Sequence, residues 1–113
     1  MRNLTRISFP VSIALLAGFA FAGEPTTPLG KWMKPNIGVP LAGQDFPTLK
    51  KNLTFVANNP PPGANYPKWA AMSNTGAAAA AKEDLAGVKA SCKQCHDAYK
   101  ESYKKEFATR AFP

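Results

Sequence analysis

The sequence predicts an all-α fold, a short four-helix bundle, and three observations support this expectation. Apolar side chains recur every three or four residues in the last third of the chain, which is the spacing of one helix face. Further segments begin with capping residues or first-turn prolines, which are signals of helix starts. The length of 113 residues is enough for one small domain.

The first 22 residues have the pattern of a signal peptide. Two arginines precede an uncharged apolar run that ends in Ala-Phe-Ala at residues 20–22, and this spacing of small residues suits signal peptidase. The run is shorter than the roughly 20 residues that a membrane-spanning helix needs, and Pro10 and Gly18 interrupt it. We therefore expect removal of residues 1–22, export of the domain 23–113 to the periplasm, and no stable membrane insertion after cleavage.

The exported chain is expected to be basic. The whole sequence has 14 lysines and arginines against 7 acidic residues, and loss of Arg2 and Arg6 with the signal peptide leaves a net charge of +5. The lysines are spread along the chain and are not clustered with aromatic residues, so we expect no nucleic-acid binding. A basic surface steers a protein toward partners with acidic surfaces, and salt weakens this steering.

The first helical segment is expected to be short or kinked. Thr27 serves as its N-cap, and Pro28 stands at the first helical position. An apolar stripe then recurs every four residues: Leu29, Met33, Ile37 and Leu41. Pro35 and Pro40 oppose a straight helix, because proline lacks a backbone N–H and clashes with the preceding turn.

Two further helices are expected in the middle of the chain. Asp45, followed by Pro47, starts a helix that ends near residue 58. Its apolar face consists of Phe46, Leu49, Leu53 and Val56. A turn-rich connector at residues 58–67 leads to a helix over 67–82, with Pro67 in its first turn. The inward side of that helix is small apart from two residues: Trp69, Met72, Thr75 or Gly76, and Ala79 or Ala80. Such a face allows a partner helix or a flat ligand to approach closely.

The last helix is expected to run from about Asp84, its N-cap, to about Phe107. One apolar face extends along it: Leu85, Val88, Cys92, Cys95, Tyr99, Tyr103 and Phe107. Its second half contains the sequence SCKQCHDAYK at residues 91–100, which holds both cysteines and the only histidine of the chain.

The spacing Cys92-x-x-Cys95-His96 is typical of a c-type haem attachment site. Two cysteines in an exported chain also allow a disulfide or a thioredoxin-like redox pair, but that pair belongs to a βαβ context that is missing here. A structural zinc site needs four ligands, and these three residues supply too few. Haem uses all three, because the thiols form thioethers with its vinyl groups and His96 ligates the iron. We therefore expect one covalent haem c attached through Cys92 and Cys95.

The haem is also expected to form part of the hydrophobic core. A mature chain with few large aliphatic residues cannot bury much apolar surface by itself, and covalent haem supplies the missing surface. Tyr99, one turn after His96, is expected to pack beside the haem.

A family resemblance is carried by two stretches, KASCKQCHDAYK at residues 89–100 and LGKWMKPN at residues 29–36. They resemble the C-terminal signature and the first-helix segment of class II c-type cytochromes, the cytochrome c′ family with its low-spin, methionine-ligated branch. In class I cytochromes the haem motif lies near the N-terminus and a ligating methionine follows it, whereas the 17 residues after His96 contain none. The resemblance implies a four-helix bundle with haem on the C-terminal helix. The chain is shorter than a usual member, so we expect a monomer in place of the family's usual dimer.

The resemblance also implies the second ligand of the iron. It maps the distal methionine of the low-spin branch onto Met33, with Met72 as the competing thioether and an open face as the third possibility. With His96 and Met33 bound, we expect a low-spin electron carrier that meets redox proteins with acidic docking surfaces. With an open face, we expect a five-coordinate binder of nitric oxide or carbon monoxide. The chain has no second histidine for acid-base chemistry, so we expect no enzyme.

Overall fold

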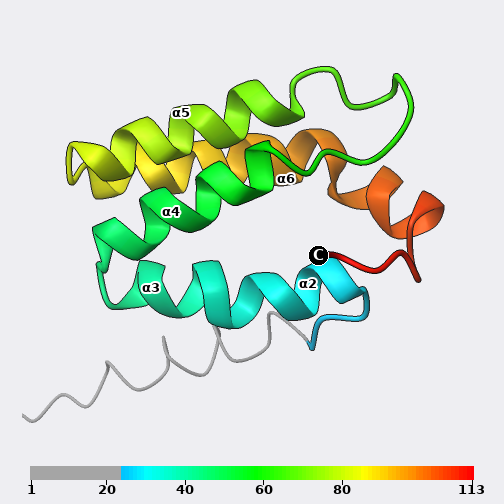
Figure 1. Cartoon of the computed structure of the whole chain (residues 1–113), viewed down its shortest axis with the longest axis horizontal. Helices are drawn as coiled ribbons and strands as arrows, with labels where there is room; N and C mark the ends of the chain where they lie inside the picture. The colour runs from blue at the N-terminus through cyan, green and yellow to red at the C-terminus, as the bar shows by residue number, and fades with distance from the viewer. Residues whose placement is uncertain (1–23) are drawn as a thin grey trace, which may run out of the picture.

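The computed structural model describes residues 24–113, and the chain is all-helical over that range. Four helical segments follow one another in alternating directions (Figure 1). They are α2 (Pro28–Met33) continued by a π-helical turn η1 (Lys34–Gly38) and α3 (Val39–Ala42), then α4 (Phe46–Ala57), α5 (Trp69–Ala81) and α6 (Leu85–Glu106). The predicted all-α fold is therefore confirmed. The predicted signal peptide, residues 1–22, lies outside the described residues.

The first segment starts as its sequence predicts. The Thr27 hydroxyl accepts a hydrogen bond from the backbone N–H of Gly30 at 3.0 Å, and Pro28 occupies the first helical position. The expected interruption takes the form of η1, a widened turn in which the N–H of Val39 donates to the carbonyl of Lys34, five residues earlier. A π-turn of this kind keeps the chain helical where prolines remove regular donors.

A side chain from the next helix supplies a donor that Pro40 lacks. In a regular helix the carbonyl of Asn36 would pair with the N–H of residue 40, which is a proline. Instead, the amide of Asn52 in α4 donates to that carbonyl at 2.7 Å. The Asn36 side chain in turn donates to the carbonyl of Trp32 at 2.8 Å. These two bonds attach the irregular part of the first segment to α4.

The other helices begin close to the predicted positions, with one difference. Asp45 caps α4 and Asp84 caps α6, each through its side-chain carboxylate, as expected. The helix expected over 67–82 begins at Trp69, so Pro67 lies in the turn before it and not in its first turn. Lys68 has a non-helical backbone (φ −101°, ψ 7°), and the N–H of Trp69 closes a turn to the carbonyl of Tyr66 at 3.2 Å. The N–H of Lys68 donates to the hydroxyl of Tyr99 in α6 at 2.8 Å.

Helix α5 packs closely against both α4 and α6, and the first segment packs on α4. The small residues of α5 permit this approach. A Cβ added at Gly76 would lie 2.9 Å from the Ser91 hydroxyl and 3.2 Å from Leu53, so the glycine is needed where the three helices meet. The first segment is not among the helices that pack closely on α6.

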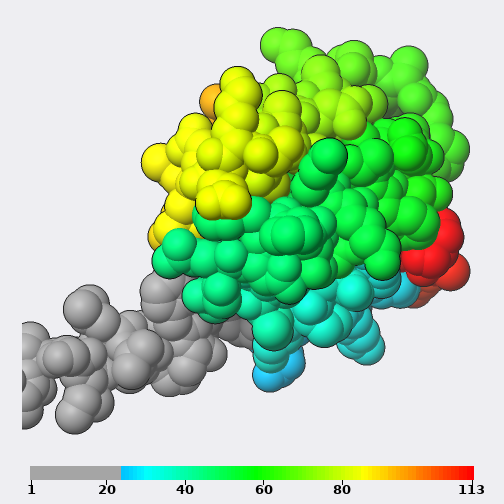
Figure 2. Space-filling view, turned by 60° about the vertical axis from the view of Figure 1, so that its left-hand side comes forward, coloured from blue at the N-terminus to red at the C-terminus, as the bar shows by residue number. Residues whose placement is uncertain are grey.

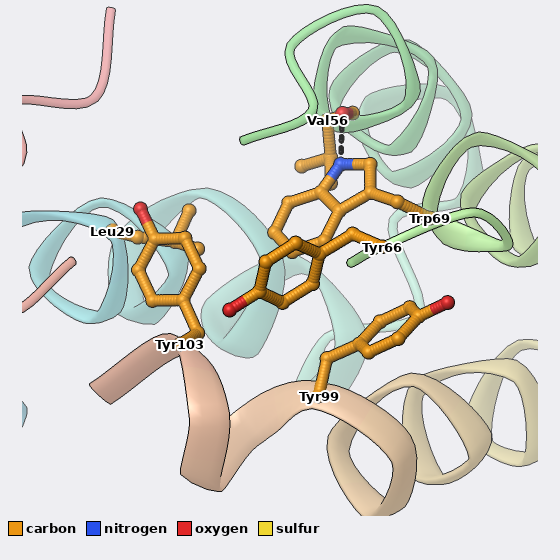
Figure 3. Close-up of a cluster of buried hydrophobic side chains, with 6 residues drawn as sticks. All are labelled: Leu29, Val56, Tyr66, Trp69, Tyr99 and Tyr103. Carbon is orange, nitrogen blue, oxygen red and sulfur yellow. Dashed lines mark hydrogen bonds between the residues drawn. The ribbon is translucent and has the colours of Figure 1, made fainter. Parts of the chain in front are cut away.

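Two clusters of buried side chains form the core. The aromatic cluster, drawn in Figure 3, consists of Leu29, Val56, Tyr66, Trp69, Tyr99 and Tyr103. The aliphatic cluster consists of Ile37, Leu49, Leu53, Ala77, Ala80 and Val88. Met33 packs against both clusters, whereas Cys95 packs against the aromatic one and Cys92 against the aliphatic one. Met33, Cys92 and Cys95, three of the residues predicted to bind haem, therefore border the two clusters.

Candidate functional site

A cavity of about 520 Å³ separates the first segment from α6, with α4 and α5 contributing to its walls. Its volume lies in the range of pockets that bind small molecules and cofactors. Its walls are mainly apolar, with Leu29 and Ile37 from the first segment, Leu53 and Val56 from α4, and Trp69 from α5. The cavity explains why the first and last helical segments, neighbours in an ordinary bundle, do not pack closely on each other here.

The wall formed by α6 carries the whole attachment motif. Cys92, Cys95, His96 and Tyr99 all line the cavity. Steps of three and four residues place Cys92, Cys95 and Tyr99 on one helix face, and His96 borders that face. Both cysteines are half-buried, and they are not joined in a disulfide. Tyr99 is buried, and its ring lies 5.0 Å from that of Tyr66, measured between centroids.

The surroundings of the motif set its protonation state. Burial raises the pKa of the Cys92 thiol, and burial together with the nearby Cys92 raises that of Cys95 to about 11. His96 is exposed at the cavity, yet partial desolvation by the surrounding protein lowers the pKa of its ring; the charge of Lys100 lowers this pKa further, and that of Asp97 opposes the shift. At neutral pH the thiols are therefore protonated and the imidazole is neutral, with a lone pair available to a metal.

Both candidate methionines reach the same cavity from different walls. Met33 comes from the first segment, across the cavity from α6. Met72 comes from α5, which packs directly on α6, and its carbonyl accepts a hydrogen bond from the Ser91 hydroxyl at 2.5 Å. Met33 thus lies on the wall across the cavity from α6, whereas Met72 lies on a helix that is itself packed against α6.

Lysines stand at the polar part of the cavity lining. Lys34 comes from the first segment, and Lys100 and Lys104 come from α6, one and two turns after His96. The single acidic side chain of the lining is Glu24, whose carboxylate lies 3.5 Å from the Lys34 ammonium in an exposed ion pair. The lining thus presents apolar walls and an excess of positive charge.

The lining fits haem in its chemistry. The macrocycle and its vinyl groups need apolar walls and two thiols, the iron needs an imidazole and a soft second ligand, and the propionates need cations. Each of these needs is met by residues that line the one cavity.

Sequence reasoning missed two buried residues that shape the site. Tyr66, in the connector before α5, packs against Trp69 and Tyr99, and its hydroxyl donates to the Glu106 carboxylate at 2.5 Å. Figure 3 shows Tyr66 in the middle of the aromatic cluster, with the Trp69 indole donating to the carbonyl of Val56 at 2.8 Å. The sequence signal for Tyr66 was that a large aromatic residue stands within a turn-rich connector. The second missed residue is Asn52. Because Pro40 has no N–H, the carbonyl of Asn36 lacks its usual helical donor, and this could have indicated that a side chain such as that of Asn52 supplies one.

Comparisons of the chain with protein-family models, with curated proteins and with solved structures find no match. Within residues 24–113, no three histidine, cysteine or acidic side chains gather to hold a metal ion. In the same range, no helix has the length and apolar character needed to cross a membrane. The resemblance to class II cytochromes therefore rests on the two stretches of sequence that carry it.

Proposed function

We propose that this chain is an exported monohaem c-type cytochrome that carries electrons. Cys92 and Cys95 would hold the haem through thioethers, and His96 and Met33 would ligate its iron. The observation that carries the proposal is that these four residues, far apart in sequence at positions 33 and 92–96, line one apolar cavity. The class II resemblance supports the same assignment, as a shortened, low-spin member of that family.

When bound, the haem supplies a one-electron iron couple. His96 is prepared for its role because its lowered pKa keeps the imidazole neutral. The thioether of Met33 favours ferrous iron and raises the reduction potential. The apolar walls exclude water, and the packing of Met33 against both core clusters limits its displacement when the charge of the site changes.

The charge of the lining suits both the propionates and a docking partner. Lys34, Lys100 and Lys104 can neutralise the carboxylates of the haem at the edge of the cavity. The net charge of +5 expected after loss of Arg2 and Arg6 would attract redox proteins with acidic surfaces. We accordingly propose a monomeric periplasmic carrier, and not an enzyme.

The test is spectroscopy of the protein produced in a host that attaches haem to Cys-x-x-Cys-His motifs. The ferric protein should show the near-infrared band of a methionine sulfur bound to iron. We expect Met33→Leu to lose this band and Met72→Leu, the matched control on α5, to keep it. The reverse pattern would identify Met72, and not Met33, as the second ligand of the iron. A wild-type protein without the band, whose ferrous form binds carbon monoxide, would instead be the five-coordinate gas binder.

A further inference from the structure

The C-terminal tail connects the haem-bearing helix to the opposite wall of the cavity. After α6, residues 107–113 turn back and end over α2 (Figure 1). Figure 2 shows these last residues, in red, against the surface formed by α4 and the first segment. The contact is aromatic, because the Phe112 ring lies 5.0 Å from Trp32 and 5.8 Å from Phe55, between centroids. Trp32 and Phe55 are themselves stacked at 5.6 Å.

The Arg110 side chain attaches the tail to the rest of the fold. One guanidinium nitrogen donates to the carbonyl of Pro60 at 3.4 Å, in the connector between α4 and α5. The other lies 3.5 Å from the hydroxyl of Tyr103 in α6, and the guanidinium sits 5.9 Å from the centre of the Phe107 ring. The tail is thus attached to the connector and to α6 before it reaches Trp32.

Phe112 contacts the first segment at Trp32, next to Met33. Trp32 immediately precedes Met33, and both side chains pack against the two core clusters. The first segment and α6 are separated by the cavity and do not pack closely on each other. Phe112, continuous with α6, therefore bridges the two walls outside the cavity, at the turn of the first segment that carries Met33.

We propose that Phe112 is a positioning residue that keeps Met33 on the iron by fixing the first segment relative to α6. This inference rests on the proposed His96 and Met33 ligation. Without the Phe112 ring, the first segment would keep its attachment to α4 through Asn52 and the packing of Leu29 near Tyr103, but it would lose the contact with the tail at Trp32, next to Met33. The segment could then move outward, and the site would populate a five-coordinate form.

The experiment compares Phe112→Ala with Phe112→Tyr, which keeps an aromatic ring, and with Thr109→Ala, an exposed position of the same tail. We expect Phe112→Ala to retain covalent haem and helicity, to weaken the sulfur-to-iron band, to lower the reduction potential, and to bind carbon monoxide about tenfold more tightly in the ferrous state. Both control variants should behave as wild type. Phe112→Leu, which keeps apolar bulk, should give an intermediate result even if the alanine variant folds poorly.

Two outcomes separate this inference from the proposed function. If wild type shows the sulfur-to-iron band, and the alanine and leucine variants keep its intensity, the reduction potential and the carbon monoxide affinity, Phe112 does not position Met33. If wild type lacks the band, the methionine ligation itself is wrong, and Phe112 has no ligand to position.

Discussion

Replacement of Asn52 by alanine tests how the irregular first segment is held in place. The Asn52 side chain is 9% exposed and donates at 2.7 Å to the carbonyl of Asn36. Pro40 offers no N–H to that carbonyl, so the variant leaves a partly buried acceptor without its partner.

The expected magnitude follows from this geometry. A buried acceptor left unpaired costs roughly 1–3 kcal/mol, and the bond from Asn52 to Asn36 lies in a partly buried position. We expect Asn52→Ala to lower the free energy of unfolding by about 2 kcal/mol. In a domain of this size that corresponds to a fall in Tm of about 10 °C.

The assay is thermal and denaturant unfolding of the haem-loaded protein, followed by far-ultraviolet circular dichroism. Asn59→Ala is the matched control, because the Asn59 amide also donates to a carbonyl, that of Phe55 at 2.8 Å, but in an exposed position. Asn59→Ala should lower the free energy of unfolding by about 0.5 kcal/mol or less. Equal losses in the two variants would refute the claim that the Asn36 carbonyl depends on Asn52.

Three other predictions follow from single features of the fold. Glu83, directly after α5, has a φ of 56°, so Glu83→Gly should raise the free energy of unfolding by about 1 kcal/mol, and an unchanged denaturation midpoint would contradict this. Burial and the hydrogen bond to Glu106 raise the pKa of Tyr66 above 10.0. The neutral phenol therefore stabilises the fold below pH 10.0, and this contribution is lost as the pH rises through the raised pKa. In Tyr66→Phe the loss of stability between pH 9 and 11 should be shallower than in wild type, as measured by urea midpoints across this range; parallel curves would count against it. Cys92→Ala combined with Cys95→Ala should leave a haem-free chain with little cooperative unfolding, and a sharp calorimetric transition in that variant would show that haem is not needed for folding.

Features that depend on neighbouring residues could be predicted from the sequence. Thr27, Asp45 and Asp84 cap helices because their side chains reach N–H groups three residues later, a relation visible in the sequence itself. The apolar stripe of Leu29, Met33, Ile37 and Leu41 was also predictable from its four-residue spacing, because these residues still lie on the inward side of the segment despite the π-turn.

Features that depend on distant partners could not be predicted in this way. The start of α5 was placed two residues early, and the local sequence does not show the hydrogen bond at this start, from Lys68 to Tyr99, 31 residues away. The bond from Asn52 and the return of Phe112 to Trp32 likewise join segments whose proximity only the packing of the helices determines. In the site, the motif of α6 was evident from its spacing. The cavity that Met33 shares with this motif required the arrangement of all four helical segments.

The most direct test of the central claim is one set of absorbance spectra of the exported protein, oxidised and reduced, with and without carbon monoxide. Bound covalently through Cys92 and Cys95 and ligated by His96 and Met33, the haem should give low-spin spectra in the native protein. After denaturation the haem absorbance should stay with the chain, because the thioethers do not depend on the fold. At concentrations that just saturate an open ferrous haem, carbon monoxide should leave the native reduced spectrum unchanged. A protein that carries no haem from a host competent to attach it, or a reduced spectrum that shifts at once with carbon monoxide, would contradict the proposed electron carrier.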